Sequence, residues 1–170
     1  IVATLTEAAS RFGRPVDQLS GLGVGLSGVV HVPDGLVHWS PSLDRGNVPF
    51  RAMLEPALGM PVFLDNDANL VAKAEQLFGE GREVRDFLVV TIEHGVGLGI
   101  IINGEIYRGT RGCGAEFGHT KVHLDGALCR CGQRGCLEAY VADYALLREA
   151  SVVLPELEGH NAEDRLDALF

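Results

Sequence analysis

Apolar and polar residues alternate along the chain with two different periods. Helical spacing over residues 1–12 predicts a helix that ends at Gly13, and similar spacing after Asp65 predicts a second helix that ends at Gly79. Short apolar runs predict strands over residues 21–32, with a turn at Ser27-Gly28, and over 36–39, 60–64, 87–92 and 98–102. Helices and strands therefore mix throughout the chain, which is typical of an α/β protein.

Turn residues and apolar stripes complete this prediction. Pro33-Asp34-Gly35 and Asn103-Gly104 are typical of tight turns between antiparallel strands. A short helix interrupted by proline is expected over residues 50–58. Apolar stripes mark the expected buried faces of two longer helices: Leu70, Val71, Ala74, Leu77 and Phe78 in one, and Leu137, Tyr140, Val141, Tyr144 and Leu147 in the other.

The composition of the 170 residues indicates a folded chain with an acidic balance. Hydrophobic residues make up 46% and charged residues 22%, so the chain is able to bury a core. The formal net charge of -9 argues against nucleic acid or a membrane as a direct partner of this chain. No apolar run approaches the roughly 20 residues of a membrane span, and no secretory leader is present, so we expect a cytoplasmic protein.

The two ends of the chain indicate a piece of a longer polypeptide. The first residue is Ile1 rather than methionine, and residues 165–170 have a helical pattern without a stop signal. We therefore expect one domain, or one domain and part of another, in these residues.

The cysteines indicate a metal site. All four lie between residues 113 and 136, and three of them form Cys129-x-Cys131-x4-Cys136, which His119 precedes by ten residues. One imidazole and three thiolates are a common ligand set for a closed, structural zinc site, and thiolates favour zinc over calcium or magnesium. Cys113 or His123 is an alternative fourth ligand, and a disulfide or free buried thiols are the alternatives to a metal.

Three carboxylates are candidates for binding or proton transfer. Asp67 lies where a buried strand gives way to a helix, so it is either a base for a substrate hydroxyl or an ordinary helix N-cap. Glu116 and Glu138 flank the proposed zinc ligands, which would hold both carboxylates in place. Carboxylates held in this way suit hydrogen bonds to sugar hydroxyls. The alternative for each is a surface acid or, for Glu138, a charge at the start of a helix.

Glycines after the strand at residues 87–92 raise the possibility of a phosphate loop. Gly95-Val96-Gly97-Leu98-Gly99 is the run in question, and a tight turn is the alternative. The acidic Glu93 beside it and the strand that follows it both weigh against phosphate binding. Asp44-x-Gly46 has only a weak similarity to the start of a phosphate loop and is interpreted as a surface turn.

At this point the chain resembles the ROK family, which is named for its repressors, open reading frames and kinases. The resemblance runs from about Gly21 to Tyr144. Its most specific parts are Glu116-Phe117-Gly118-His119, similar to the family's E-x-G-H, and residues 129–138, similar to C-x-C-G-x-x-G-C-L-E. Asn66-Asp67 is similar to the N-D pair of the family.

This resemblance implies a zinc site and a sugar site. The implied zinc ligands are His119, Cys129, Cys131 and Cys136. The residues implied to line the sugar site are Gly28, Asn66, Asp67, Glu116, His119 and Glu138. In family kinases the aspartate that corresponds to Asp67 is the catalytic base.

The resemblance also implies the actin-like, ribonuclease-H-like two-domain α/β fold of sugar kinases, with the sugar in the cleft between the domains. Residues 1–65 would belong to the smaller domain, and residues 66–170 to the larger domain, with the zinc loop at 113–138. The D-x-G-x-T phosphate loop of family kinases would lie before Ile1. The fold is therefore expected to be incomplete at the N-terminus.

One departure from the kinase pattern bears on function. Family kinases typically have G-T-G-x-G-G-G where this chain has residues 93–99, which begin Glu93-His94 and are similar to the sugar-responsive repressors. We therefore expect the sugar-binding effector domain of a homodimeric transcriptional repressor, which would contact DNA through an absent N-terminal domain. The alternative is an ATP-dependent, glucokinase-like sugar kinase that uses Mg-ATP, with Asp67 as general base.

Overall fold

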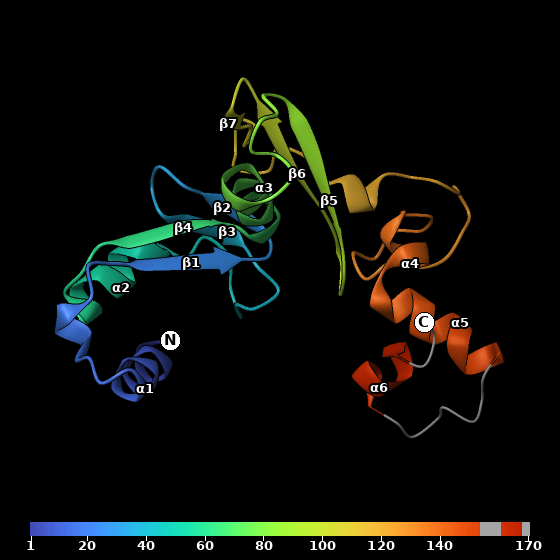
Figure 1. Ribbon diagram of the computed structural model, residues 1–170. Coiled ribbons are helices and arrows are strands. Elements are labelled where there is room, and N and C mark those ends of the chain that lie inside the picture. The colour runs from blue at the N-terminus through green and yellow to red at the C-terminus, as the bar shows by residue number, and fades with distance from the viewer. Residues whose placement is uncertain (154–160, 168–170) are drawn as a thin grey trace.

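Helix α3 (Asp67–Phe78) lies at the centre of the molecule and contacts two separate sheets (Figure 1). One sheet is the parallel pair of β1 (Leu22–Leu26) and β4 (Val62–Asn66), and the other is a three-stranded antiparallel sheet. The computed structural model describes residues 1–153 and 161–167. Helices and strands mix within these residues, so the predicted α/β class is confirmed.

The first core lies beside the parallel pair. The hairpin of β2 (Val29–His31) and β3 (Leu36–Trp39) confirms the turn predicted between these strands. Val30, Val37 and Val62 are at most 1% exposed and form the centre of this core. Three helical segments add apolar side chains to it: α1 (Val2–Arg11), the short 3-10 helix η1 (Val16–Gln18) and α2 (Phe50–Leu58).

The second sheet follows α3 in the chain. Its strands are β5 (Phe87–Ile92), β6 (Val96–Ile102) and β7 (Glu105–Ile106). Asn103 and Gly104 join β6 to β7, and both have positive φ angles, 56° and 77°. A two-residue turn between antiparallel strands often requires positive φ at both positions, and Asn-Gly adopts them at low cost. The turn predicted at these residues is therefore confirmed.

The predicted buried face of α3 was wrong. The helix packs against β6 through small residues, since Ala68 and Ala72 are buried and face Gly97 and Gly99. A Cβ atom on Gly99 would lie 2.5 Å from the Ala72 Cβ and from the Ala68 carbonyl oxygen. Close approach of helix and strand thus selects alanine and glycine. All five residues of the predicted stripe are exposed instead: Leu70, Val71, Ala74, Leu77 and Phe78.

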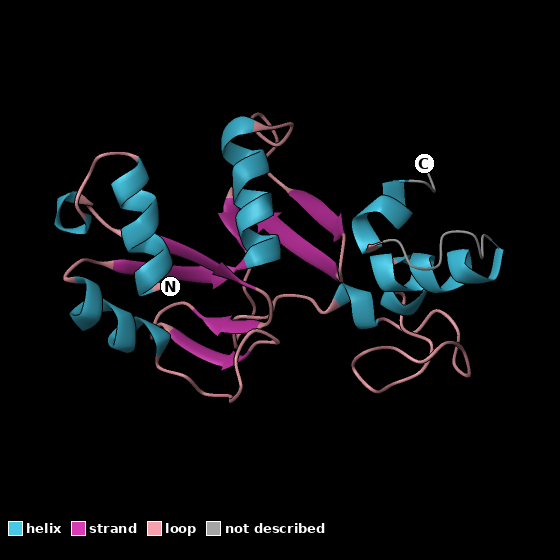
Figure 2. Cartoon of the chain, turned by 90° about the horizontal axis from the view of Figure 1, so that it is seen from below, coloured by secondary structure: helices cyan, strands magenta, loops and turns pink. Residues whose placement is uncertain are grey.

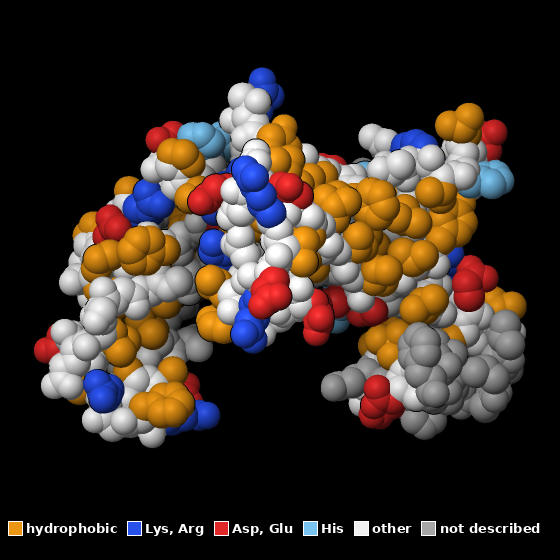
Figure 3. All heavy atoms as spheres, turned by 45° about the horizontal axis from the view of Figure 1, so that its top comes forward, with side chains coloured by type: hydrophobic (Ala, Val, Ile, Leu, Met, Phe, Trp, Pro, Cys, Tyr) orange, Lys and Arg blue, Asp and Glu red, His pale blue; other side chains and the backbone are white. Residues whose placement is uncertain are grey.

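The opposite face of the antiparallel sheet is apolar and exposed. Leu88, Val90 and Ile92 of β5 are 63%, 46% and 55% exposed, and Ile102 of β6 is 46% exposed. An apolar band is visible at this position in the space-filling view (Figure 3). Because the apolar run of β5 is continuous, both faces of this strand are apolar. Among the described residues, α3 covers one of these faces, and the other is exposed.

Helices α4 (Glu138–Val141), α5 (Asp143–Val153) and α6 (Ala162–Asp167) lie at the opposite end of the molecule from α1 and α2 (Figure 2). The sequence predicts one helix across the α4–α5 region, and this prediction was wrong. Ala142 is extended, with ψ of 158°, and separates the two helices. The break leaves the Asp143 N–H free to donate to the Glu93 carbonyl oxygen at 3.0 Å, which attaches α5 to the end of β5.

Two further sequence predictions concern the chain ends and the domains. The helix predicted over residues 165–170 overlaps α6, while residues 168–170 lie outside the described part. Among the described residues, no helix combines the length and the apolar character that crossing a bilayer requires. The predicted domain boundary at residue 65 falls near the end of β4. The division into two domains itself stays a prediction.

Substitution of Gly99 by alanine should destabilise the protein, because the added methyl group would collide with α3. We expect the free energy of unfolding to fall by about 1–3 kcal/mol, as overpacked cores typically show. Gly23→Ala is the matched control, because a Cβ on this β1 glycine would meet no atom within 4 Å. Urea denaturation measures both, and equal midpoints for the two variants would contradict the packing described for α3.

Candidate functional site

One cavity of about 740 Å³ lies where the β4–α3 junction, the β5–β6 turn and the cysteine-rich loop meet. All six residues predicted to line a binding site border this cavity: Gly28, Asn66, Asp67, Glu116, His119 and Glu138. They come from segments far apart in the chain. The structure therefore brings the candidate residues together, while the role of each in binding stays a prediction.

Asn66 and Asp67 are held by the start of α3. The Asn66 side chain is the N-cap, because its Oδ1 accepts a hydrogen bond from the Asn69 N–H at 3.2 Å. Its Nδ2 donates to the Gly28 carbonyl oxygen at 3.0 Å. The Asp67 carboxylate accepts from the Ser27 hydroxyl and from the Ala68 N–H. The alternative that Asp67 is the N-cap is thus wrong, since Asn66 occupies that position.

The backbone conformation at position 28 requires glycine. Its φ of 111° is rare for residues with a side chain, and a Cβ atom would lie 2.2 Å from the Trp39 carbonyl oxygen. The glycine lets the segment between β1 and β2 lie against the end of β3. Its carbonyl group then reaches the Asn66 amide, so Gly28 orients one of the polar side chains that border the cavity.

The four predicted metal ligands form a cluster. One ligand atom from each of His119, Cys129, Cys131 and Cys136 can be chosen so that all four lie within 4.8 Å of one another. The Cys131 and Cys136 sulfurs are 3.7 Å apart, as are the Cys129 sulfur and the His119 Nδ1. Metal–sulfur bonds of about 2.3 Å in a tetrahedron place two sulfurs about 3.8 Å apart. The donor set and its spacing thus fit a tetrahedral divalent ion.

The positions of the cysteines and histidines also bear on the alternative fourth ligands and on the alternative of a disulfide. Cys113 and His123 do not belong to the cluster found among the described residues, so His119 completes it. All four cysteines are free thiols, which excludes a disulfide in this structure. A tight turn brings the cysteines together, because the Gly132 N–H donates to the Cys129 carbonyl oxygen and the Cys129 N–H donates to that of Gln133.

Polar groups around the sulfurs suit thiolate ligands. The Lys121 Nζ donates to the Cys136 sulfur at 3.0 Å, and the Tyr144 hydroxyl lies 3.7 Å from the Cys129 sulfur. Burial raises the pKa of the Cys129 thiol to about 11 in the absence of an ion. A hydrogen bond with the Gln133 backbone lowers the pKa of Cys131. An ion bound here must displace the Cys129 proton, so its affinity falls as pH falls.

Glu138 connects the metal cluster to β6. Its side chain is buried, and its Oε2 accepts a hydrogen bond from the Val96 N–H at 3.2 Å. Its Oε1 accepts from the Cys129 thiol at 3.5 Å. Glu116, by contrast, is exposed at the cavity. Glu138 is therefore a fixed carboxylate rather than a surface acid, and the alternative that it lies at the start of a helix is confirmed, because it is the first residue of α4.

The glycine run after β5 is largely a strand. Gly97 and Gly99 lie within β6 and face α3, and only Gly95 belongs to the β5–β6 turn. The Glu93 N–H donates to the Gly95 carbonyl oxygen at 2.9 Å and closes this turn. Glu93 and His94 border the cavity. Two of the three glycines thus serve packing, which weakens the phosphate-loop interpretation.

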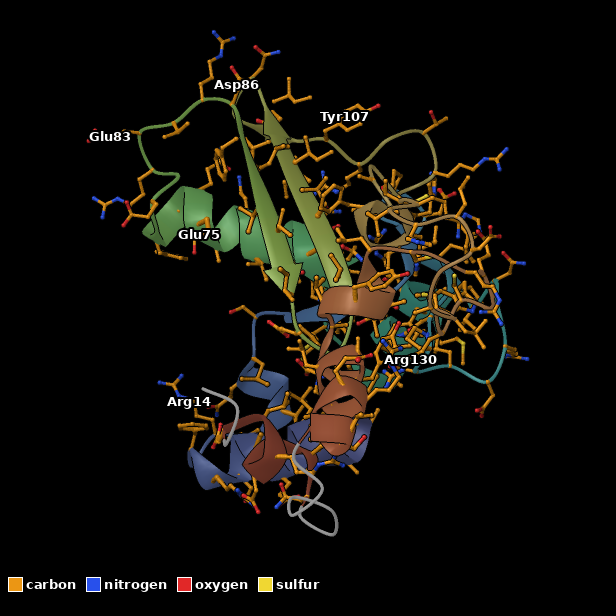
Figure 4. The ribbon with its side chains drawn as sticks, turned by 90° about the vertical axis from the view of Figure 1, so that its right-hand side faces the viewer. Arg14, Glu75, Glu83, Asp86, Tyr107 and Arg130 are labelled. Carbon is orange, nitrogen blue, oxygen red and sulfur yellow. The ribbon has the colours of Figure 1, made fainter. Side chains whose placement is uncertain are left out.

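Some residues at the site gave no separate signal in the sequence. Ser27 is hydrogen-bonded to Asp67 across 40 positions of the chain, and Tyr144 was expected only as part of an apolar stripe. Arg130 is labelled in Figure 4. Its guanidinium lies 4.1 Å from the centroid of the Tyr144 ring and donates to the His94 carbonyl oxygen. These contacts depend on the tertiary fold, and local patterns do not predict them.

Comparisons with known proteins point to one family. The family profile described as ROK family matches residues 1–166. The chain is 37% identical to a xylose repressor of Caldicellulosiruptor bescii over 145 residues, which cover 85% of this chain and 35% of the repressor. It is 38% identical to a glucokinase of Streptomyces coelicolor over 149 residues, which cover 88% of this chain and 46% of the kinase.

A solved structure agrees with this assignment. The crystal structure of a ROK family glucokinase from Streptomyces griseus, in complex with glucose and AMPPNP, matches with a TM-score of 0.75 and 33% identity. The match covers 91% of this chain and 51% of that chain. This chain thus spans roughly a third to a half of the length of the relatives compared here, and these include both repressors and kinases.

Cys131→Ser should release the bound ion and lower the melting temperature, because a structural metal contributes directly to folding. Cys113→Ser is the matched control, since Cys113 is also an exposed thiol in the same region but lies outside the cluster. Elemental analysis after gel filtration measures the metal content of both. Full metal content in the Cys131 variant, or metal loss in the Cys113 variant, would contradict the ligand set.

Proposed function

Because this chain belongs to the ROK family, we propose that its cavity binds a sugar and that it is the effector part of a sugar-responsive transcriptional repressor. The observation that carries the proposal is that six residues from distant parts of the chain border one cavity beside the metal cluster: Gly28, Asn66, Asp67, Glu116, His119 and Glu138. Sugar binding is also supported by the relative whose structure contains glucose.

The polar groups at the cavity are suited to a polyhydroxylated ligand. Carboxylates of Asp67, Glu116 and Glu138 are acceptors for hydroxyl donors, and ionised acceptors form the stronger hydrogen bonds. The Asn66 amide adds an N–H donor, and a His119 imidazole that binds the ion through one ring nitrogen keeps an N–H donor on the other. Such a set distinguishes a sugar from an apolar ligand, since each carboxylate is able to accept two hydroxyl groups.

Zinc is the metal that we assign to the cluster. Three thiolates and an imidazole favour zinc over calcium or magnesium, and four protein ligands leave no position for a reactive water. When bound, zinc supplies structural cross-linking rather than catalysis. The ion would hold residues 119–136 together and thereby keep His119 and Glu138 at the cavity.

The repressor function is favoured by the charge at the β5–β6 turn. Glu93 borders the cavity where family kinases approach the nucleotide phosphates, and His94 pairs with the Asp143 carboxylate at 2.9 Å. A carboxylate repels a triphosphate but tolerates a neutral sugar. The similarity to the xylose repressor agrees with this function. DNA contact would involve another domain of the protein, because the net charge of -9 of this chain opposes binding to phosphates.

A sugar kinase is the second candidate, and Asp67 is the observation that favours it. The carboxylate borders the cavity and is fixed by Ser27 and Ala68, as a general base requires. The similarity to glucokinases supports the same function. In that case Asp67 would accept the proton of a sugar hydroxyl as this oxygen attacks the γ-phosphate of Mg-ATP.

Glu138→Gln should weaken sugar binding about tenfold or more without metal loss, because a hydrogen bond to a charged acceptor is replaced by one to a neutral amide. Calorimetric titration of the protein that carries this chain with glucose, xylose and N-acetylglucosamine measures the effect. Glu83→Gln is the control, since Glu83 lies far from Arg130 and the cavity (Figure 4). An unchanged titration would assign Glu138 a structural role only.

A coupled assay of ADP release separates the two candidate functions. We expect sugar binding without ADP release above background in the protein that carries this chain, with a glucokinase as the positive control. Turnover near the common enzyme value of about 10 per second, lost in Asp67→Asn, would overturn the repressor function and establish the kinase. The same assay run with each sugar identifies the substrate in that case.

A further inference from the structure

Residues 107–116, the crossing loop, connect β7 to the 3-10 helix η2 (Phe117–His119) and return to the first half of the chain. Tyr107 marks the start of this loop at the sheet (Figure 4). The last part of the loop, residues 112–116, borders the cavity and ends at Glu116. The loop therefore supplies one wall of the cavity, while the β4–α3 junction supplies another.

An ion pair attaches the start of the crossing loop to the end of β4. The Arg108 Nε and Nη2 donate to the Asp65 Oδ2 at 3.0 and 2.6 Å. The other carboxylate oxygen of Asp65 accepts from the Asn66 N–H and the Asn69 side-chain amide at 2.8 and 3.0 Å. The Asp65 side chain is 9% exposed, so this carboxylate is desolvated and depends on its four donors.

A second contact holds the tip of the crossing loop. Gly112 is buried with φ of 84°, and a Cβ atom there would lie 1.9 Å from the Val30 carbonyl oxygen in β2. Only glycine permits this approach. The loop thus touches the first half of the chain at two separate points, Arg108 and Gly112, and both precede Glu116 in the chain.

We propose that Arg108 is a positioning residue for the cavity: through Asp65 it sets the distance between Glu116 on the crossing loop and the Asn66-Asp67 pair. The same Asp65 carboxylate accepts from the Asn66 backbone N–H and the Asn69 side-chain amide, so one group orients both walls. This inference rests on the proposed sugar site. Arg108 itself does not border the cavity and acts only through the residues it holds.

Arg108→Lys tests the proposal with the least risk to folding. Lysine keeps a positive charge near Asp65 but loses the two donors in one plane, so the pairing becomes less defined. We expect glucose, xylose or N-acetylglucosamine to bind about tenfold or more weakly, since small displacements of positioned groups have large effects. Arg85→Lys is the matched control, because among the described residues the Arg85 side chain donates to Asn103 at the far turn and should leave binding unchanged.

A second variant removes the ion pair without leaving a buried charge. Asp65→Asn combined with Arg108→Ala keeps an acceptor for Asn69 and should fold with its metal bound. Hydrogen exchange of residues 109–116 should become faster in this variant, while exchange in residues 119–136, which contain the metal cluster, stays unchanged. Weaker sugar binding with normal metal content supports a positioning role, and unchanged exchange and unchanged affinity overturn it.

A double-mutant cycle distinguishes positioning from general destabilisation. If Arg108 acts through Glu116, Arg108→Lys should weaken binding little further in a protein that already carries Glu116→Gln. If the loss of sugar affinity in the double variant equals the product of the losses in the two single variants, the proposal is wrong. If the unmodified protein binds none of the three sugars, the proposed function fails. If it binds one of them and Arg108→Lys binds equally well, only the inference about Arg108 fails.

Discussion

The proposed site depends on the clustering of four side chains whose possible ligand atoms lie within 4.8 Å of one another: His119, Cys129, Cys131 and Cys136. The segment between His119 and Cys136 contains only isolated strand bridges, so an ion held by these four side chains would cross-link a stretch with little regular structure. Glu138 follows the last ligand directly and shares a contact with Cys129. A metal site of this kind is a means of holding a loop still where a carboxylate has to point in a defined direction.

The packing of α3 is the second constraint. Ala68 and Ala72 allow the helix to lie close to Gly97 and Gly99 of β6, and its first residues remain attached to β4. The N-terminal end of α3 is therefore held near both sheets. Asn66 and Asp67 lie at that end, which explains why a cavity forms there rather than along the exposed side of the helix.

The cavity has an acidic character that bears on its ligand. Glu93, Glu116 and Glu138 border it together with Asp67, whereas the guanidinium of Arg130 is already engaged by Tyr144 and the His94 carbonyl group. Neutral hydroxyl groups are compatible with this surface, and phosphates are less so. The relatives include both a repressor and kinases, so membership of the family does not by itself separate the two candidate functions.

The sequence by itself determined the features that depend on neighbouring residues. The spacing of Cys129, Cys131 and Cys136, the Asn103-Gly104 turn and the strand-to-helix junction at Asn66 are local, because backbone and side-chain chemistry over a few residues decides them. Only the tertiary structure decided the small-residue face of α3, the break at Ala142 and the pairing of Arg108 with Asp65. Each of these joins segments far apart in the chain, and the close approach of two elements, not the period of one, selects the residues in contact.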